Sequence, residues 1–174
     1  MMSPMQTILG QWLFSLKQYI SMSLFLSSPE RLPCNRYCTG LTILTYYLLC
    51  LGLVDEERGF AELAAHLTLE LGLLALFVYT GLRWKKSMAR FQQTFSALVG
   101  VNMIVTLASI LLYRIDTGYE NPLENPLFYL LLLWNLAVMS LIFKRALDIP
   151  VHLSAMIAFN YYVVYQFILI WFYW

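Results

Sequence analysis

Three residues in one apolar stretch of the chain have side chains that could carry out chemistry. Glu62, His66 and Glu70 follow one another at intervals of four residues, and on a helix this spacing places them along one face. Two carboxyl groups and an imidazole in such a row could conduct protons or bind a metal ion. We favour a structural interpretation, in which Glu62 lies at the outer surface, His66 lies in the membrane interface, and Glu70 is protonated and hydrogen-bonded to a neighbouring helix.

Amide side chains occur at matching depths in three other apolar stretches. Asn102, Asn135 and Asn160 each lie near the middle of their stretch. An amide without a hydrogen-bond partner in hydrocarbon raises the free energy of the folded protein, so these side chains should turn inward and meet. We therefore predict a polar cluster of Glu70 with the three asparagines, and Gln166 is a further candidate member. The cluster would be a binding cavity or ion site or, as we favour, a set of hydrogen bonds that holds the helices together.

The composition indicates what has to position these side chains. Of the 174 residues, 60% are hydrophobic and 12% are charged, whereas soluble domains have about 45–50% apolar and about 25% charged residues. A soluble protein of this length keeps about a third of its extended-chain surface exposed, so it could not hide this much apolar surface. The same numbers exclude a disordered chain, a collagen, a secreted disulfide scaffold and a nucleic-acid-binding domain.

Five stretches are long and apolar enough to cross a bilayer as helices, because a hydrocarbon core about 30 Å thick needs about 20 residues. Residues 7–26 differ from them, because apolar side chains at helical spacing share that stretch with Lys17, and this pattern predicts an amphipathic helix in the membrane interface. The sequence therefore predicts an all-α polytopic membrane bundle, with residues 1–174 as a single membrane domain. The predicted spans are about 37–54, 61–82, 91–113, 127–143 and 151–173.

The basic residues predict the orientation of the chain. Lys and Arg in short loops favour the cytoplasmic side, and an N-inside, C-outside arrangement places 9 of the 11 basic residues inside. We expect this arrangement in a bacterial inner membrane. The turn between the second and third spans could bind lipid headgroups or an acidic partner, although a positive flank with an interfacial Trp anchor explains it as well. Its candidate contact residues are Arg83, Trp84, Lys85, Lys86 and Arg90.

Cofactor and metal ligands are not expected. His66 and His152 are predicted near opposite faces of the membrane, so they cannot share a haem. Cys34 and Cys38 are four residues apart, but the sequence offers them no nearby His or further Cys. No nucleotide-binding loop, zinc-protease motif or serine-hydrolase motif occurs. We predict no catalytic residues and no nucleic-acid partner.

One segment carries a family resemblance. The stretch from Ala89 to Gly100 (ARFQQTFSALVG) resembles a motif in small, uncharacterised proteobacterial inner-membrane proteins, where it enters a middle helix. The turn from Pro29 to Pro33 and the acidic Glu70 in the preceding helix match the same proteins. Those proteins are similar to the Yip1-like group of five-span membrane proteins. The resemblance covers residues 24–145 and implies five spans, but it implies no activity.

The same stretch has a physical interpretation beside the resemblance. Arg90 should stay at the cytoplasmic boundary, at the start of the third predicted span. Ser96, Ala97 and Gly100 have small side chains, which let another helix approach closely. The pattern therefore predicts a packing and docking surface before it predicts a catalytic one.

These observations support three hypotheses of function. The first is a non-enzymatic inner-membrane protein, an accessory or assembly subunit that docks on a larger membrane complex; its partners would be the bilayer and either another membrane protein or further copies of itself. The second is a small transporter or ion-conducting protein that uses Glu70 as the titrating group. The third, which we favour least, is a lipid-modifying enzyme, for which the reactive groups near a headgroup plane would be His66 with Glu62, or His152 with Asp148.

Overall fold

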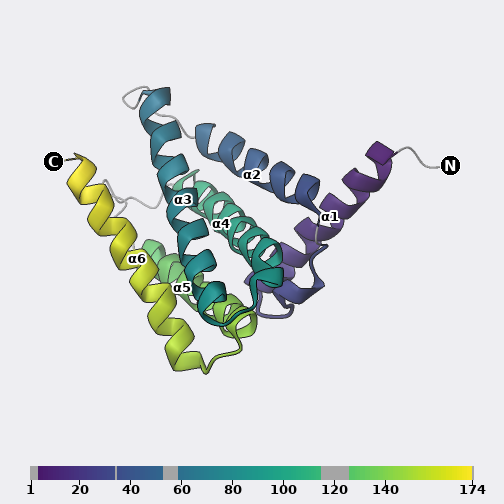
Figure 1. Ribbon diagram of the computed structural model, residues 1–174. Helices are drawn as coiled ribbons and strands as arrows, with labels where there is room; N and C mark the ends of the chain where they lie inside the picture. The colour runs from purple at the N-terminus through teal and green to yellow at the C-terminus, as the bar shows by residue number, and fades with distance from the viewer. Residues whose placement is uncertain (1–3, 34, 53–58, 115–125, 174) are drawn as a thin grey trace.

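A computed structural model of the protein describes residues 4–33, 35–52, 59–114 and 126–173. Within these ranges the chain forms six α-helices and two short 3-10 helices and no strand (Figure 1). The prediction of an all-α protein is therefore confirmed. The elements are α1 (Pro4–Ser23), η1 (Pro29–Arg31), α2 (Arg36–Leu51), α3 (Phe60–Trp84), η2 (Met88–Arg90), α4 (Phe91–Arg114), α5 (Pro126–Leu147) and α6 (Val151–Tyr173).

From α2 to α6 successive α-helices run in opposite directions, and the ends of α1, α3 and α5 lie in the lower part of Figure 1. Phe25, Lys86 and Asp148 follow these three helices, and each has a positive φ although none is glycine. Such a residue lets the next N–H reach back to a free carbonyl of the last turn. Those bonds run from Leu26 to Ser21, from Ser87 to Leu82 and from Ile149 to Lys144.

Four of the helices are long and apolar enough to cross a membrane. The first predicted span, residues 37–54, falls on α2, which has 16 residues. The last two residues of this span, 53 and 54, lie outside the described part. About 20 residues are needed to cross a bilayer in helical form, so the count of five spans stays a prediction. The four helical segments are Phe60–Trp84, Met88–Leu112, Pro126–Leu147 and Val151–Trp171.

α5 is longer than the predicted span of 127–143. It continues through Lys144 and Arg145 to Leu147. Basic side chains in the last turn of a helix interact favourably with the negative end of the helix dipole, so the two charges extend the helix instead of ending it. Pro126 occupies the first position, where its missing N–H costs nothing.

α1 packs differently from the predicted amphipathic helix. Its large apolar residues, including Leu9 and Leu13, are exposed, while Ser15, Tyr19 and Ser23 are buried against the bundle. Ser15 therefore lies on the face of α1 that contacts the bundle. Its hydroxyl donates to the Gln11 carbonyl within the same turn, at 2.9 Å, so burial leaves the hydroxyl satisfied.

The loop after α1 satisfies the longer polar side chains of this helix. Asn35 donates to the Gln11 side chain at 2.7 Å, and Ser27 donates to the Gln18 side chain. The amide side chains of Gln11 and Gln18 therefore bond to the protein.

α4 occupies the centre of the bundle and contacts α1, α2, α3 and α5. Its predicted small surface is confirmed at Gly100, because a Cβ added there would lie 2.4 Å from the Tyr19 ring of α1. The Tyr19 hydroxyl lies 2.7 Å from the Ser96 hydroxyl and 3.1 Å from that of Thr42. Glycine at position 100 is thus what lets the α1 tyrosine reach the interior.

Candidate functional site: the polar contacts of Glu70

The carboxyl group of Glu70 joins three helices near mid-membrane. The Tyr46 hydroxyl of α2 donates to both carboxyl oxygens, at 3.0 Å each. The Asn102 amide of α4 donates to one of them at 3.4 Å. Tyr46 and Asn102 are both buried, so the hydrogen bonds lie in a region of low dielectric constant, where they are electrostatically strong. We call Glu70, Tyr46 and Asn102 the Glu70 triad.

The sequence analysis did not include Tyr46. The signal that could have found it is periodic: Cys38, Thr42, Tyr46 and Cys50 are the buried residues of α2 and recur every four residues. A row of small or polar side chains on one face of an otherwise apolar helix marks the face that contacts protein in a membrane. Without this row, the sequence predicts α2 only as a membrane span.

Two buried amide oxygens lack partners. Asn102 uses its nitrogen toward Glu70, and its Oδ1 has no hydrogen-bond partner within the described part of the chain. The Oδ1 of Asn135 on α5 is also buried and unpartnered among the described residues. Among the described residues Asn135 makes no hydrogen bond to Glu70, so the predicted cluster includes Asn102 in direct contact and leaves Asn135 on the neighbouring helix.

Asn160 and Gln166 do not join the predicted cluster. Asn160 is exposed, and Gln166 donates to the Tyr162 hydroxyl on the same helix at 3.0 Å. α6 buries a different face, on which Ser154, Ala158 and Tyr161 lie at helical spacing. The Ser154 hydroxyl lies 3.1 Å from that of Ser140 on α5. Because Asn160 is two residues from Ala158, the helical rotation turns it away from this face.

The predicted stripe of Glu62, His66 and Glu70 has a different environment at each residue. Glu62 is exposed. His66 places its Nε2 2.5 Å from the Tyr165 hydroxyl of α6, and the two rings meet edge to face. Within the described part of the chain no group of three His, Cys, Asp or Glu side chains is placed to hold a metal ion. The stripe therefore joins α3 to α6 at His66 and to α2 and α4 at Glu70.

An aromatic stack connects the His66 contact with the interior. Tyr165 stacks on Tyr161 with ring centroids 6.2 Å apart, and Tyr161 meets the edge of Phe77 on α3 at 5.4 Å. Edge-to-face and offset rings at such separations stabilise packing beyond their buried area. The tyrosines of α6 thus include a protein-facing set at Tyr161 and Tyr165.

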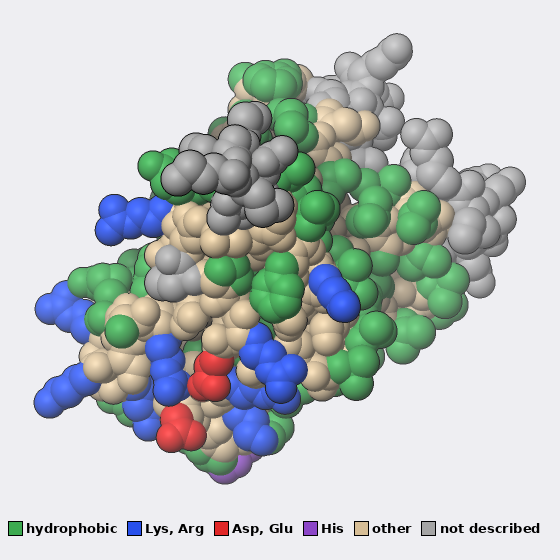
Figure 2. Space-filling view, turned by 90° about the vertical axis from the view of Figure 1, so that its right-hand side faces the viewer, with side chains coloured by type: hydrophobic (Ala, Val, Ile, Leu, Met, Phe, Trp, Pro, Cys, Tyr) green, Lys and Arg blue, Asp and Glu red, His purple; other side chains and the backbone are tan. Residues whose placement is uncertain are grey.

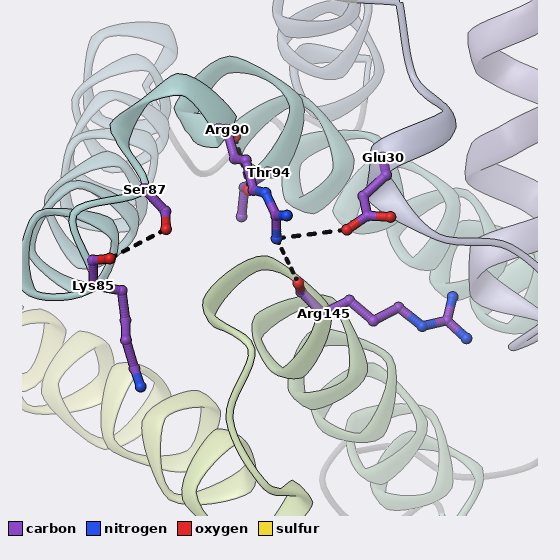
Figure 3. Close-up of polar contacts among 6 residues, drawn as sticks. All are labelled: Glu30, Lys85, Ser87, Arg90, Thr94 and Arg145. Atoms are coloured by element: carbon purple, nitrogen blue, oxygen red, sulfur yellow. Dashed lines mark hydrogen bonds and ion pairs between the residues drawn. The ribbon is translucent and has the colours of Figure 1, made fainter.

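The end of the molecule that carries most of the basic residues has one ion pair in the described part. Arg90 lies 3.5 Å from Glu30 of η1 and donates to the carbonyl of Arg145 on α5 at 3.3 Å (Figure 3). Arg145 in turn donates to the Ser27 carbonyl. Figure 2 shows Lys and Arg side chains gathered around two acidic ones over the lower part of one face. We call residues 27–31, 83–90 and 144–148 the basic end.

The other candidate contacts at the basic end project outward. Trp84 is 70% exposed, and Lys85 places its Nζ 5.1 Å from the centre of the Trp84 ring. In Figure 3 the Lys85 side chain points toward α6, away from the Arg90 contacts. Arg83 donates to the Tyr79 hydroxyl at 2.9 Å. Lys86 is also exposed and lies in the turn after α3, where it has a positive φ.

The buried hydroxyl of Tyr19 is a polar site that the sequence analysis missed. Burial raises the pKa of Tyr19 above its usual range, and hydrogen bonds with Ser96 and Thr42 act in the opposite direction. The neutral phenol therefore both donates and accepts, which joins α1, α2 and α4. The periodicity of α1 offered no signal, because Tyr19 is one of many aromatic residues in an apolar chain.

Two pockets are described, and neither is lined by Glu70. One is a cavity of about 10 Å³ beside Arg145 and Ser27. The other is a groove of about 490 Å³ between the end of α3 and the outward face of α6. We call it the α6 groove, and it is lined by Trp84, Ile149, Leu153, Met156, Ile157, Phe159, Asn160 and Val163.

No known protein family, curated protein or solved structure matches this chain. The four apolar helices identify a membrane protein as the class that the architecture supports. The resemblance to Yip1-like proteins remains a prediction.

Proposed function

We propose that the protein is a non-enzymatic integral membrane protein, an accessory or assembly subunit that docks on a larger membrane complex. The observation that carries this proposal is the large uncovered surface of α6. Only 17% of an apolar 18-residue segment of α6 is buried within the chain, whereas 44% of the corresponding segment of α4 is buried. The uncovered face includes Asn160, an amide at mid-membrane depth, and such groups usually face protein.

The contacts of Glu70 support a structural role for the intramembrane acid. Its carboxyl group accepts from Tyr46 and Asn102, which lie on two other helices. In a membrane, hydrogen bonds between helices replace the hydrophobic effect that holds soluble bundles together. An acid engaged in this way holds the scaffold on which a docking surface can form.

The charge distribution supports an orientation with the basic end in the cytoplasm of a bacterium. Nine basic residues flank the helices at this end or lie in α1, and the positive-inside rule places such flanks in the cytoplasm. We propose a location in the inner membrane, with the N-terminus inside, the C-terminus outside and a fifth span in α2.

The test is co-purification from native membranes in mild detergent. We expect at least one other membrane protein to remain bound to the full-length chain through two affinity steps. Recovery of the chain alone in every mild detergent would overturn the proposal.

A second candidate function is ion conduction or small-solute transport through Glu70. The observation that favours it is the orphaned Oδ1 of Asn102 beside the carboxyl group, because an unpaired buried oxygen next to an acid can accept a hydrogen bond or coordinate a cation. The test measures proton and solute flux in liposomes with Glu70→Gln, and with Glu62→Gln on the exposed part of the same helix as the control. Flux that is lost only in Glu70→Gln would support transport, and unchanged flux would exclude it.

A further inference from the structure

Asn160 is the most unusual group on the outer surface of the described chain. It lies nine residues after Val151, the first residue of α6, and therefore about 14 Å along the helix. That distance is about half the thickness of a hydrocarbon core. Its side chain is exposed and makes no hydrogen bond to the described part of the chain. An amide in this position would contact acyl chains, which offer it neither donor nor acceptor.

The surroundings of Asn160 form a concave apolar surface. The α6 groove passes beside it and extends to Trp84 and Ile149 at the basic end. Met156 and Phe159, on the same helix, are 66% and 61% exposed. Such a groove can receive another helix. The apolar side chains of that helix would fill the groove, and one polar side chain would bond to the Asn160 amide.

We infer that this face is covered by a second copy of the chain, with α6 packed beside α6 and the two Asn160 amides hydrogen-bonded to each other across a two-fold axis. An amide contains both a donor and an acceptor, so two identical amides can satisfy one another. Copies that insert with the same topology also bring Asn160 to the same depth and the helices into parallel alignment. A different partner would need a polar residue at that depth by coincidence.

Charge at the basic end is compatible with this pairing. Lys85 lies over Trp84, which lines the groove, and points toward α6. Asp148, just before the groove residue Ile149, is exposed as well. A two-fold arrangement, which repeats each contact in both directions, therefore brings groups of opposite sign to the same end of the interface.

The inference deepens the proposed function and rests on it in one respect, namely that protein and not lipid covers α6. It adds the identity of the neighbour: the larger complex would contain two copies of this chain. The proposed function needs a different protein in the complex, so the two statements can fail separately.

The experiment is photo-crosslinking of the full-length chain in native membranes. The residues at positions 156 and 163, in the groove lining, are replaced one at a time by p-benzoyl-phenylalanine, and position 76 on α3 serves as an equally apolar, exposed control. Two copies with different epitope tags are co-expressed. We expect an adduct of twice the chain mass that carries both tags from positions 156 and 163, and none from position 76.

A second pair of variants tests the amide itself. In the background of the crosslinker at position 156, Asn160→Leu should reduce the doubly tagged adduct about three- to thirty-fold, whereas Asn160→Gln, which keeps an amide, should retain most of it. The substituted side chain is exposed, so folding of the single chain should be unaffected and can be checked by thermal denaturation in detergent.

The other outcomes distinguish the possible occupants. Adducts only to a different protein would overturn the second copy and leave the proposed function standing. Adducts only to lipid, or equal adducts at positions 76 and 156, would overturn the inference and remove the main support for docking. A doubly tagged adduct with no other protein in the purified complex would support the dimer and overturn the larger complex.

Discussion

α4 and α6 differ in how they use an asparagine at the middle of the membrane. The helices have similar lengths, 24 and 23 residues, and each places an amide near its centre. Asn102 of α4 is buried and donates to Glu70, while Asn160 of α6 is exposed. α4 is central and has helices around it, whereas α6 packs mainly on α5. The comparison shows that depth alone does not determine the role of a polar residue.

The largest expected effect concerns the close packing of α4. Gly100→Ala should lower the free energy of unfolding by about 1–3 kcal/mol, because overpacking forces neighbours out of position and the added Cβ would meet the Tyr19 ring. Gly72→Ala on α3 is the control, since no atom lies within 4 Å of its added Cβ. Denaturation in detergent micelles measures both, and equal stability of the two variants would contradict the close approach of α1.

Removing the acid of the Glu70 triad should have the next largest effect. Glu70→Ala leaves the Tyr46 hydroxyl and the Asn102 amide without their acceptor, which should lower the free energy of unfolding by about 1–3 kcal/mol. Glu70→Gln keeps an acceptor oxygen and should lose less. Thermal denaturation in detergent compares the two, and an Ala variant as stable as the Gln variant would show that the triad does not stabilise the bundle.

Replacement of each of the two asparagines by leucine should have different effects on the free energy of unfolding. Asn102→Leu should destabilise the single chain by about 0.6–2 kcal/mol, because its hydrogen bond is internal. Asn160→Leu should leave the unfolding of the single chain unchanged, because its amide has no partner there. Denaturation of both variants in a detergent that keeps the chain monomeric is the measurement. Equal destabilisation would mean that Asn160 faces the interior after all.

The smallest expected effect lies at the basic end. Both members of the Arg90–Glu30 pair are about half exposed, so Glu30→Ala should change the free energy of unfolding by about 0–1 kcal/mol, with the difference decreasing as salt is added. Unfolding at low and high ionic strength checks this. A large, salt-independent loss would place this contact among the buried ones that surround α4.

The sequence predicted the helices better than the faces they present. Continuous apolar stretches define α3 to α6 within a few residues, because the membrane requires a minimum length of apolar helix. Because apolar residues surround most of each helix, the sequence does not show which face of α4 or α6 turns inward. Asn102 and Asn160 are therefore equivalent in the sequence, and only the packing of α4 and α6 distinguishes them.

The candidate site was predictable in part. Glu70 stands out as an acid within a span, and its contact with Asn102 follows from their shared depth. Tyr46 could be distinguished from its neighbour Tyr47 only by its place in the row of buried residues on α2; Tyr47 is partly buried and contacts Thr68 instead. The buried face of α1 was not predictable for a related reason: Ser15 and Tyr19 make their contacts with residues of their own turn or of distant helices, which helical periodicity does not reveal.

The last turn of α1 is bonded to a helix that follows much later in the chain. The indole of Trp134 on α5 donates to the Ser23 carbonyl at 2.9 Å, across 111 residues, and Arg145 donates to the Ser27 carbonyl across 118. The Ser23 carbonyl lies at the end of α1, where carbonyls have no partner within their own helix, and the Ser27 carbonyl lies in the loop that follows. During synthesis, which proceeds from the N-terminus, α1 leaves the ribosome before α5. The hydrogen bonds from Trp134 and Arg145 to the Ser23 and Ser27 carbonyls can therefore form only after α5 has been synthesised.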